Sequence, residues 1–140
     1  MIEEDSVQAA IIGYMKTDPV LINFLGGTGT EIRESNYQGA DFKYPAIRVR
    51  VGPQTDPHLE SMCQYSTIEI QIDCFSEQKS SKEATEIGWE VNELLHHHSF
   101  SYMGVFFSLI DLVTSLPVAR KDERTWIKTV KFSSHVQVKP

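Results

Sequence analysis

The segment TIEIQIDC, residues 67–74, alternates polar and apolar residues at every position. Because successive side chains of a β-strand point to opposite sides of its sheet, this pattern predicts a strand with one buried face. Glu69 and Asp73 then lie on the opposite, polar face. A sheet that is apolar on one side only needs helices on that side, which is the arrangement of an α+β domain.

A second alternating segment precedes this strand. In IRVRV, residues 47–51, three apolar residues alternate with Arg48 and Arg50, which predicts another half-buried strand. We expect Gly52 and Pro53 to end it, because proline has no amide hydrogen for the strand ladder.

Two segments have helical periodicity. Apolar residues recur at helical spacing over residues 7–15, and one or two further turns are expected after Pro19. A second helix is expected after Ser80, because Ser80 and Glu83 have the spacing of a capping box and an apolar stripe follows over residues 84–95.

The C-terminal third contains strand signals only. Residues 105–116 are apolar on both sides, which predicts a strand that is central in the sheet or covered by a partner subunit. Phe106 and Phe107 cannot both enter one core from a regular strand, and a bulge at this pair is the alternative explanation. Residues 119–124 predict a hairpin turn, and residues 126–138 a long final strand.

These elements predict one α+β domain over residues 1–140, with a mainly antiparallel sheet and two helices packed on one face. A chain of 140 residues is long enough for one core. Its net charge of −6 argues against a protein that grips phosphate backbones. No apolar run has the length of a membrane span, so we expect no membrane contact, and with only two cysteines we expect a reduced, cytoplasmic chain.

Motifs that could carry chemistry are weak. Neighbouring residues on a helix point about 100° apart, so His96, His97 and His98 cannot all face one metal ion on a regular helix. The glycines of residues 26–30 lack the Gly-Lys-Ser/Thr ending of a phosphate loop, and no local nucleophile signature is present. We therefore expect no enzyme, no metal and no cofactor.

The charges on the two clearest strands are opposite in sign. If these strands are neighbours, Arg48 and Arg50 are expected to form cross-strand ion pairs with Glu69 and Asp73. The alternative is that some of these charges face an adjacent subunit and fix its register. The loop of residues 52–64 is long for a small domain, and contact with a partner protein is one interpretation of its length.

The order of several local features is similar to that of a known family. Together they resemble the tail completion or tail terminator proteins of long-tailed bacteriophages and related prophages, although the loop of residues 28–38 and the histidine run depart from that pattern. The features are Asp18-Pro19, Leu25-Gly26-Gly27, Tyr44-Pro45-Ala46-Ile47, the Ile68–Phe75 strand closed by Ser76, the helix led by Ser80, the Arg120–Arg124 turn and the final strand with Phe132.

The resemblance implies a structural virion protein without catalytic residues. It implies a ring, often a hexamer, that caps the tail tube, stops its growth and offers a docking surface to the head, with the subunit made in the host cytoplasm. The implied partners are further copies of the chain, the tail tube protein and a neck or head-completion protein, with DNA passing through the lumen without specific binding. The alternatives are a head-completion or connector protein, or a small metal-binding or hydrolytic domain.

The resemblance transfers element roles rather than individual site residues, so the candidates are taken from exposed strand faces and loops. Candidate subunit-interface residues are Arg48, Arg50, Phe106 and Phe107; candidate lumen-facing residues are Glu69 and Asp73; candidate partner-contact residues are Asp56, His58, Glu60, Arg120, Lys121 and Arg124.

Overall fold

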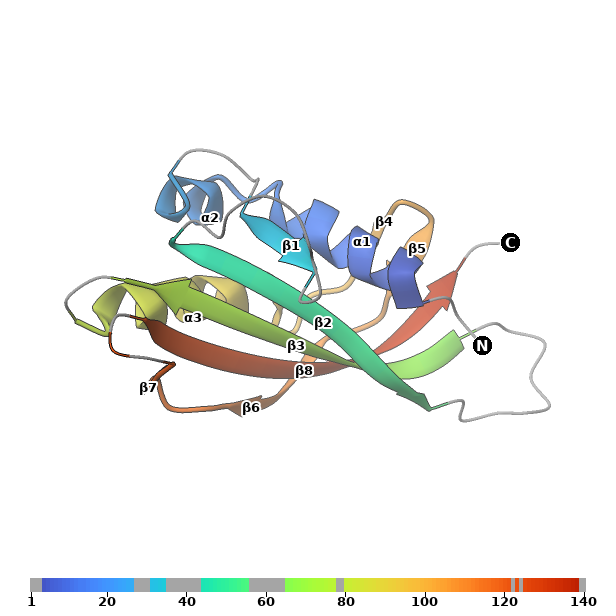
Figure 1. Cartoon of the computed structure of the whole chain (residues 1–140). Coiled ribbons are helices and arrows are strands. Elements are labelled where there is room, and N and C mark those ends of the chain that lie inside the picture. Colours follow the sequence, from blue (N-terminus) through green and yellow to red (C-terminus); the bar gives the residue numbers. More distant parts are fainter. Residues whose placement is uncertain are drawn as a thin grey trace.

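A computed structural model describes residues 4–26, 31–34, 44–55, 65–77, 80–121, 123 and 125–138. These residues form an α+β fold, as the sequence predicts (Figure 1). The helices are α1 (Glu4–Met15), α2 (Pro19–Phe24) and α3 (Lys82–Leu95); the strands are β1 (Ile32–Glu34), β2 (Ala46–Thr55), β3 (Tyr65–Ser76), β4 (Phe100–Tyr102), β5 (Val105–Phe107), β6 (Asp111–Ser115), β7 (Ala119–Arg120) and β8 (Trp126–Val138).

The strands form one curled sheet, and β8 pairs with more strands than any other described strand does. The strand order is β1-β2-β3-β8-β5-β4, and β6 and β7 also pair with β8. One edge of β8 pairs with β3 from residue 126 to residue 137, while the other edge is shared by β5, β6 and β7 in turn. Among the described strands, only β1 and β2 pair in parallel, so the sheet is mostly antiparallel, as predicted.

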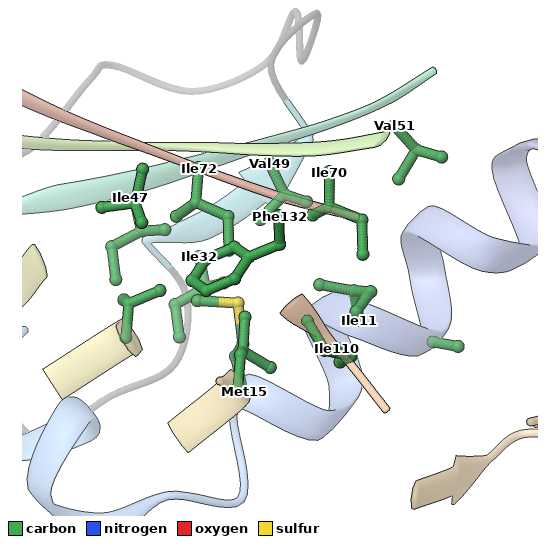
Figure 2. Close-up of a cluster of buried hydrophobic side chains, with 14 of the residues drawn as sticks. Ile11, Met15, Ile32, Ile47, Val49, Val51, Ile70, Ile72, Ile110 and Phe132 are labelled. Carbon is green, nitrogen blue, oxygen red and sulfur yellow. The ribbon is translucent and has the colours of Figure 1, made fainter. Parts of the chain in front are cut away.

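The core lies between one face of the sheet and the helices. Figure 2 shows Ile11 and Met15 of α1 beneath the sheet residues Ile70, Ile72 and Phe132. The stripe of α3 that begins at Ile87 joins the same cluster. Both long helices therefore cover the same face of the sheet. Every second residue of β2, β3 and β8 points to this face.

The prediction that Gly52 and Pro53 end the second strand is wrong. β2 continues to Thr55, and its register against β3 shifts between Val51 and Gln54. Gly52 has a φ of 141°, which glycine adopts readily. A bulge leaves residues out of the regular ladder, so proline fits there without an amide hydrogen.

The predicted capping box at the start of α3 is also wrong. The N-cap is Ser81, whose side chain makes no capping bond. The Ser80 hydroxyl accepts a hydrogen bond from the Lys82 amide at 3.4 Å, whereas the Glu83 carboxylate accepts one from the buried Ser76 hydroxyl at 2.8 Å. Glu83 therefore connects the helix to the end of β3 rather than to its own cap.

Residues 105–116 do not form the single strand that their composition predicts. They form β5 and β6, separated where the backbone of Ile110 turns toward the end of α3. The Ile110 amide donates to the His98 carbonyl at 3.1 Å, and the His97 amide donates to the Ile110 carbonyl at 2.7 Å. The bulge lies between Leu112 and Thr114, not at the phenylalanine pair.

Two hairpin turns complete the C-terminal half. Met103 and Gly104 have positive φ values of 53° and 78° and join β4 to β5, a hairpin that the sequence analysis missed. A hairpin is present where residues 119–124 predict one, but Ala119 and Arg120 already belong to strand β7. The Lys121 amide donates to the Thr125 carbonyl at 2.8 Å.

Candidate functional site

The sheet face opposite the helices is polar. Arg48 lies in register with Asp73, which in turn lies in register with Thr129; Gln71 and Lys131 form the next row with Arg50. No helix of the described residues packs on this side of β2, β3 and β8. Most of the side chains on this face are half-buried, and Arg50 is exposed.

The predicted strand neighbours are confirmed, but their charges are not joined in the predicted pairs. Arg50 donates to the Gln71 side-chain oxygen at 2.7 Å, and the Gln71 amide lies 3.3 Å from one Asp73 oxygen and 3.4 Å from the other. The Thr129 hydroxyl donates to Asp73 at 2.7 Å. Asp73 is thus bound by neutral donors, and Gln71 stands between it and Arg50. Glu69, opposite Ser133, is half-buried on the same face.

Arg48 is an internal residue of the subunit, with only 8% of its surface exposed. Its guanidinium donates to the carbonyl oxygens of Glu31 at 2.8 Å and Ile47 at 3.0 Å, and lies 4.0 Å from the Glu31 carboxylate. Burial lowers the pKa of Arg48, while the Glu31 charge acts in the opposite direction. Of the two candidate interface arginines, only Arg50 is exposed, and Arg48 instead holds the residue before β1 against β2.

The two candidate phenylalanines point to opposite sides of the sheet. Phe107 is fully buried and stacks on Phe100 with ring centroids 4.7 Å apart, so it has no surface to offer a neighbouring subunit. Phe106 is exposed and lies opposite Gln137 at the edge of the polar face. Of these two candidate interface residues, only Phe106 has exposed surface.

The candidate partner-contact residues fall only partly within the described structure. The Arg120 guanidinium lies 4.5 Å from the Trp126 ring centroid and donates to the Glu123 carbonyl at 2.7 Å. The Lys121 amine lies 4.9 Å from the Phe75 ring centroid. Both basic residues are exposed at the β7–β8 turn. The other candidates lie outside the described residues: Asp56, His58, Glu60 and Arg124.

Four large apolar side chains on and around β5 and β6 are exposed, and only Phe106 was among the predicted site residues. They are Phe106, Leu109, Val113 and Leu116, with exposed fractions of 41%, 50%, 58% and 41%. The sequence signal was the apolar character of both sides of residues 105–116. Trp89, on the outer side of α3, is 64% exposed.

A groove of about 220 Å³ separates α3 from β6. Trp89, Leu112 and Lys128 are among its lining residues. The Lys128 amine donates to the Leu116 carbonyl at 2.6 Å, and the Leu112 amide donates to the His96 ring at 3.1 Å. Two backbone groups at the ends of β6 are therefore bound by side chains.

The opposite end of the sheet has a second groove of about 350 Å³, between α1 and β1. Asp5 and Glu34 supply two carboxylates to its lining, and Ala9 and Ile12 supply apolar surface. The two grooves thus differ in chemistry, one apolar with a lysine and the other partly apolar with two carboxylates.

Two residues of the histidine run contact each other. The ring centroids of His96 and His97 are 3.7 Å apart, and the His97 Nε2 lies 3.7 Å from the Asp111 carboxylate. Within the described ranges, no three metal-ligating side chains lie together. Among the same residues, no helix is long and apolar enough to span a membrane.

The sequence from residue 9 to residue 137 matches the family model described as tail completion protein gp17. The chain belongs to this family. It is accordingly a structural tail protein of bacteriophage type, and the family resemblance predicted from its sequence is confirmed. Curated protein sequences contain no match to the chain.

Two solved structures share the fold of this tail completion family member. A chain of the virion of a native gene transfer agent particle is 14% identical, with a TM-score of 0.70 and 94% of each chain covered. A second solved chain is 11% identical, with a TM-score of 0.63, covering 100% of this chain and 99% of the other. At such identities the likeness concerns the fold alone, and it extends over nearly the whole chain.

Proposed function

We propose that the chain is a ring subunit that caps the phage tail tube, stops its growth and offers a docking surface to the head. The observation that carries this proposal is the match to the tail completion family over residues 9–137. A protein that completes a tail must recognise the end of the tube and exclude further tube subunits. A closed ring of identical subunits does both, because it occupies every site at the tube end at once.

The polar sheet face supports a second part of the proposal, in which Glu69 and Asp73 face the lumen of the ring. DNA must pass this lumen without being held, and a net charge of −6 disfavours phosphate binding. Arg50 and Lys131 both lie in register with Gln71, which stands between Glu69 and Asp73 on β3, and the bond of Arg50 to Gln71 occupies one of its donors. We assign the face no specific DNA contact.

The partners that follow are other copies of the chain, the tail tube protein and a neck or head-completion protein. Arg120 and Lys121 at the β7–β8 turn are candidates for the contact with tube or neck, because both basic side chains are exposed there. The other partner-contact candidates, Asp56, His58, Glu60 and Arg124, keep the same role as a prediction. The protein functions in the virion after assembly in the host cytoplasm, and no catalytic step is assigned to it.

Capping of purified tail tubes is the experiment that tests this function. Tubes are incubated with the protein and examined by electron microscopy, with elongation by added tube protein as the second readout. We expect a ring on one end of each tube and an arrest of elongation at that end. Binding to heads but not to tube ends would favour the alternative, a head-completion or connector protein.

A further inference from the structure

The groove between α3 and β6 is formed by one stripe of the helix and by the two strands beside it. Its α3 residues have i, i+3, i+4 and i+7 spacing, so they lie on one side of the helix: Thr85, Gly88, Trp89 and Asn92. Leu112 and Ser115 of β6 lie in register with core residues of β8, so both side chains point to the helix side. Lys128 of β8 lies in register with the buried Cys74 and points to the same side. Lys128 is the only charged residue in the described lining.

The side chain of Lys128 is held in this groove at two points. Its amine donates to the Leu116 carbonyl at 2.6 Å, and its stem passes so close to α3 that a Cβ on Gly88 would lie 2.6 Å from the Lys128 Cγ. A glycine inside a helix destabilises it relative to alanine, and a lysine fixed in one rotamer loses conformational entropy. The fold therefore accepts two unfavourable terms that keep this one ammonium group at the groove.

The fixed ammonium group has no counter-charge among the described residues. Lys128 forms no ion pair with a described carboxylate, and its bond to Leu116 uses one of its three donors. The Ser115 hydroxyl, also in the groove lining, makes no hydrogen bond to another described residue. The groove therefore offers a cation and a hydroxyl donor, and this combination suits a carboxylate.

The rest of the groove suits an apolar side chain. Trp89 and Leu112 both contribute apolar surface to the lining, and tryptophan is enriched among residues that dominate binding energy. A single cation beside apolar walls disfavours nucleic acid, whose recognition needs several clustered basic residues. The volume of about 220 Å³ is below the roughly 300–1,000 Å³ of sites for drug-sized ligands. A short protein segment with a carboxylate beside an apolar side chain matches both parts of the groove.

We propose that the α3–β6 groove binds an acidic and apolar segment of a partner protein. A carboxylate side chain of this segment pairs with the Lys128 ammonium group and accepts from the Ser115 hydroxyl. A neighbouring large apolar side chain of the segment packs on Trp89 and Leu112. The charge pair fixes the position of the segment, and the apolar contact supplies most of the affinity. This site is additional to the tube-capping function and does not depend on it.

Selection from a library of short random peptides tests the chemistry of the occupant. The wild-type protein and Lys128→Met are used as separate targets, because methionine keeps an unbranched apolar stem while the charge is removed. We expect the wild-type protein to enrich peptides with an acidic residue close to a large apolar residue, and Lys128→Met to lose them. Enrichment of the same peptides by both targets, or of no peptide by the wild-type protein, would overturn the proposal.

Calorimetric titration with the best peptide measures the contribution of each groove residue. Lys128→Met should weaken binding roughly tenfold or more, as expected for a hydrogen bond to a charged group, and Trp89→Ser by a similar factor. Lys131→Met is the matched control, because Lys131 lies on the same strand but in register with Gln71 on the polar face. It removes the same charge and should leave the affinity unchanged. An equal loss in Lys131→Met would show that only the net charge matters and would overturn the site.

A change in the peptide keeps the test independent of the stability of the variants. Replacing the acidic residue of the peptide by its amide should weaken binding to the wild-type protein roughly tenfold. The same replacement should have little effect on binding to Lys128→Met, because the two groups form one pair. Equal losses with both proteins would show that the carboxylate pairs elsewhere and would overturn the role of Lys128.

Discussion

The carboxyl group of Glu90 on α3 lies close to that of Asp18, the residue that caps α2. Burial and the neighbouring Asp18 carboxyl raise the pKa of Glu90 to about 7. One Asp18 oxygen accepts from the Val20 amide at 3.2 Å, and the other is buried with no hydrogen-bond partner among the described residues. The two carboxyl groups repel each other when both are ionised, and a proton on Glu90 removes this repulsion.

The first prediction follows from the raised pKa of Glu90. The pKa of Glu90 is higher in the folded than in the unfolded chain. Its contribution to the free energy of unfolding is therefore complete below about pH 4.5 and is lost as the pH rises through about 7. We expect this pair to lower the stability by about 1 kcal/mol between pH 5 and pH 8, a value reduced for its partial exposure.

Thermal melts at the two pH values check this first prediction. Glu90→Gln should flatten the pH dependence, since the amide is uncharged at every pH. Glu77→Gln, at an exposed position, is the control and should leave it unchanged. An equal pH dependence in wild type and Glu90→Gln would contradict the assignment.

The second prediction concerns the start of α3. Ser76→Ala should lower the free energy of unfolding by about 1 kcal/mol, because it removes the buried hydroxyl that donates to Glu83. Ser80→Ala should have a smaller effect, since its bond to the Lys82 amide is 3.4 Å long. Urea unfolding of both variants tests this, and the reverse order would support the capping box that the sequence suggests.

The third prediction concerns the two arginines of β2. Arg48→Met should cost about 3 kcal/mol, because it leaves the buried Glu31 carbonyl and carboxylate without the guanidinium. Arg50→Met, on the exposed side, should cost less than about 1 kcal/mol. Equal losses in chemical denaturation would show that Arg48 does not have this internal role.

The fourth prediction concerns Gly88, where α3 passes close to β8. A Cβ at this position would lie 2.6 Å from the Lys128 Cγ, so Gly88→Ala must displace the lysine stem and its bond to the Leu116 carbonyl. We expect a loss of about 1–2 kcal/mol, as for an overpacked contact. In Lys128→Ala, which removes the obstructing atoms, the same glycine substitution should cost much less.

A double-mutant cycle measures this coupling directly. Additive losses of unfolding free energy for Gly88→Ala and Lys128→Ala would show that the two positions are not energetically coupled.

The strands that alternate strictly were predictable from sequence because one face of each is buried. Glu69 and Asp73 accordingly lie on the polar side of β3. The division of residues 105–116 was not predictable, because it depends on backbone bonds between Ile110 and the end of α3, which are distant from any local pattern. The burial of Arg48 was missed for a related reason, since alternation gives the side of the sheet but not a partner such as Glu31 on another segment.

The candidate site was predictable to a similar degree. The apolar character of both sides of residues 105–116 predicted exposed apolar side chains such as Phe106, whereas the groove lined by Trp89 and Leu112 depends on the packing of α3 beside β6. The carboxylates of the α1–β1 groove come from Asp5 and Glu34, which only the parallel placement of β1 brings together.

The dependence of four other strands on β8 has a consequence for the timing of synthesis. β3, β5, β6 and β7 find their common neighbour only in residues 126–138, which the ribosome makes after all of them. Until translation passes this point, β6 and β7 have no partner strand, and β3 and β5 each have one unpaired edge. Contacts so distant in sequence form slowly, so the sheet is completed only at the end of synthesis.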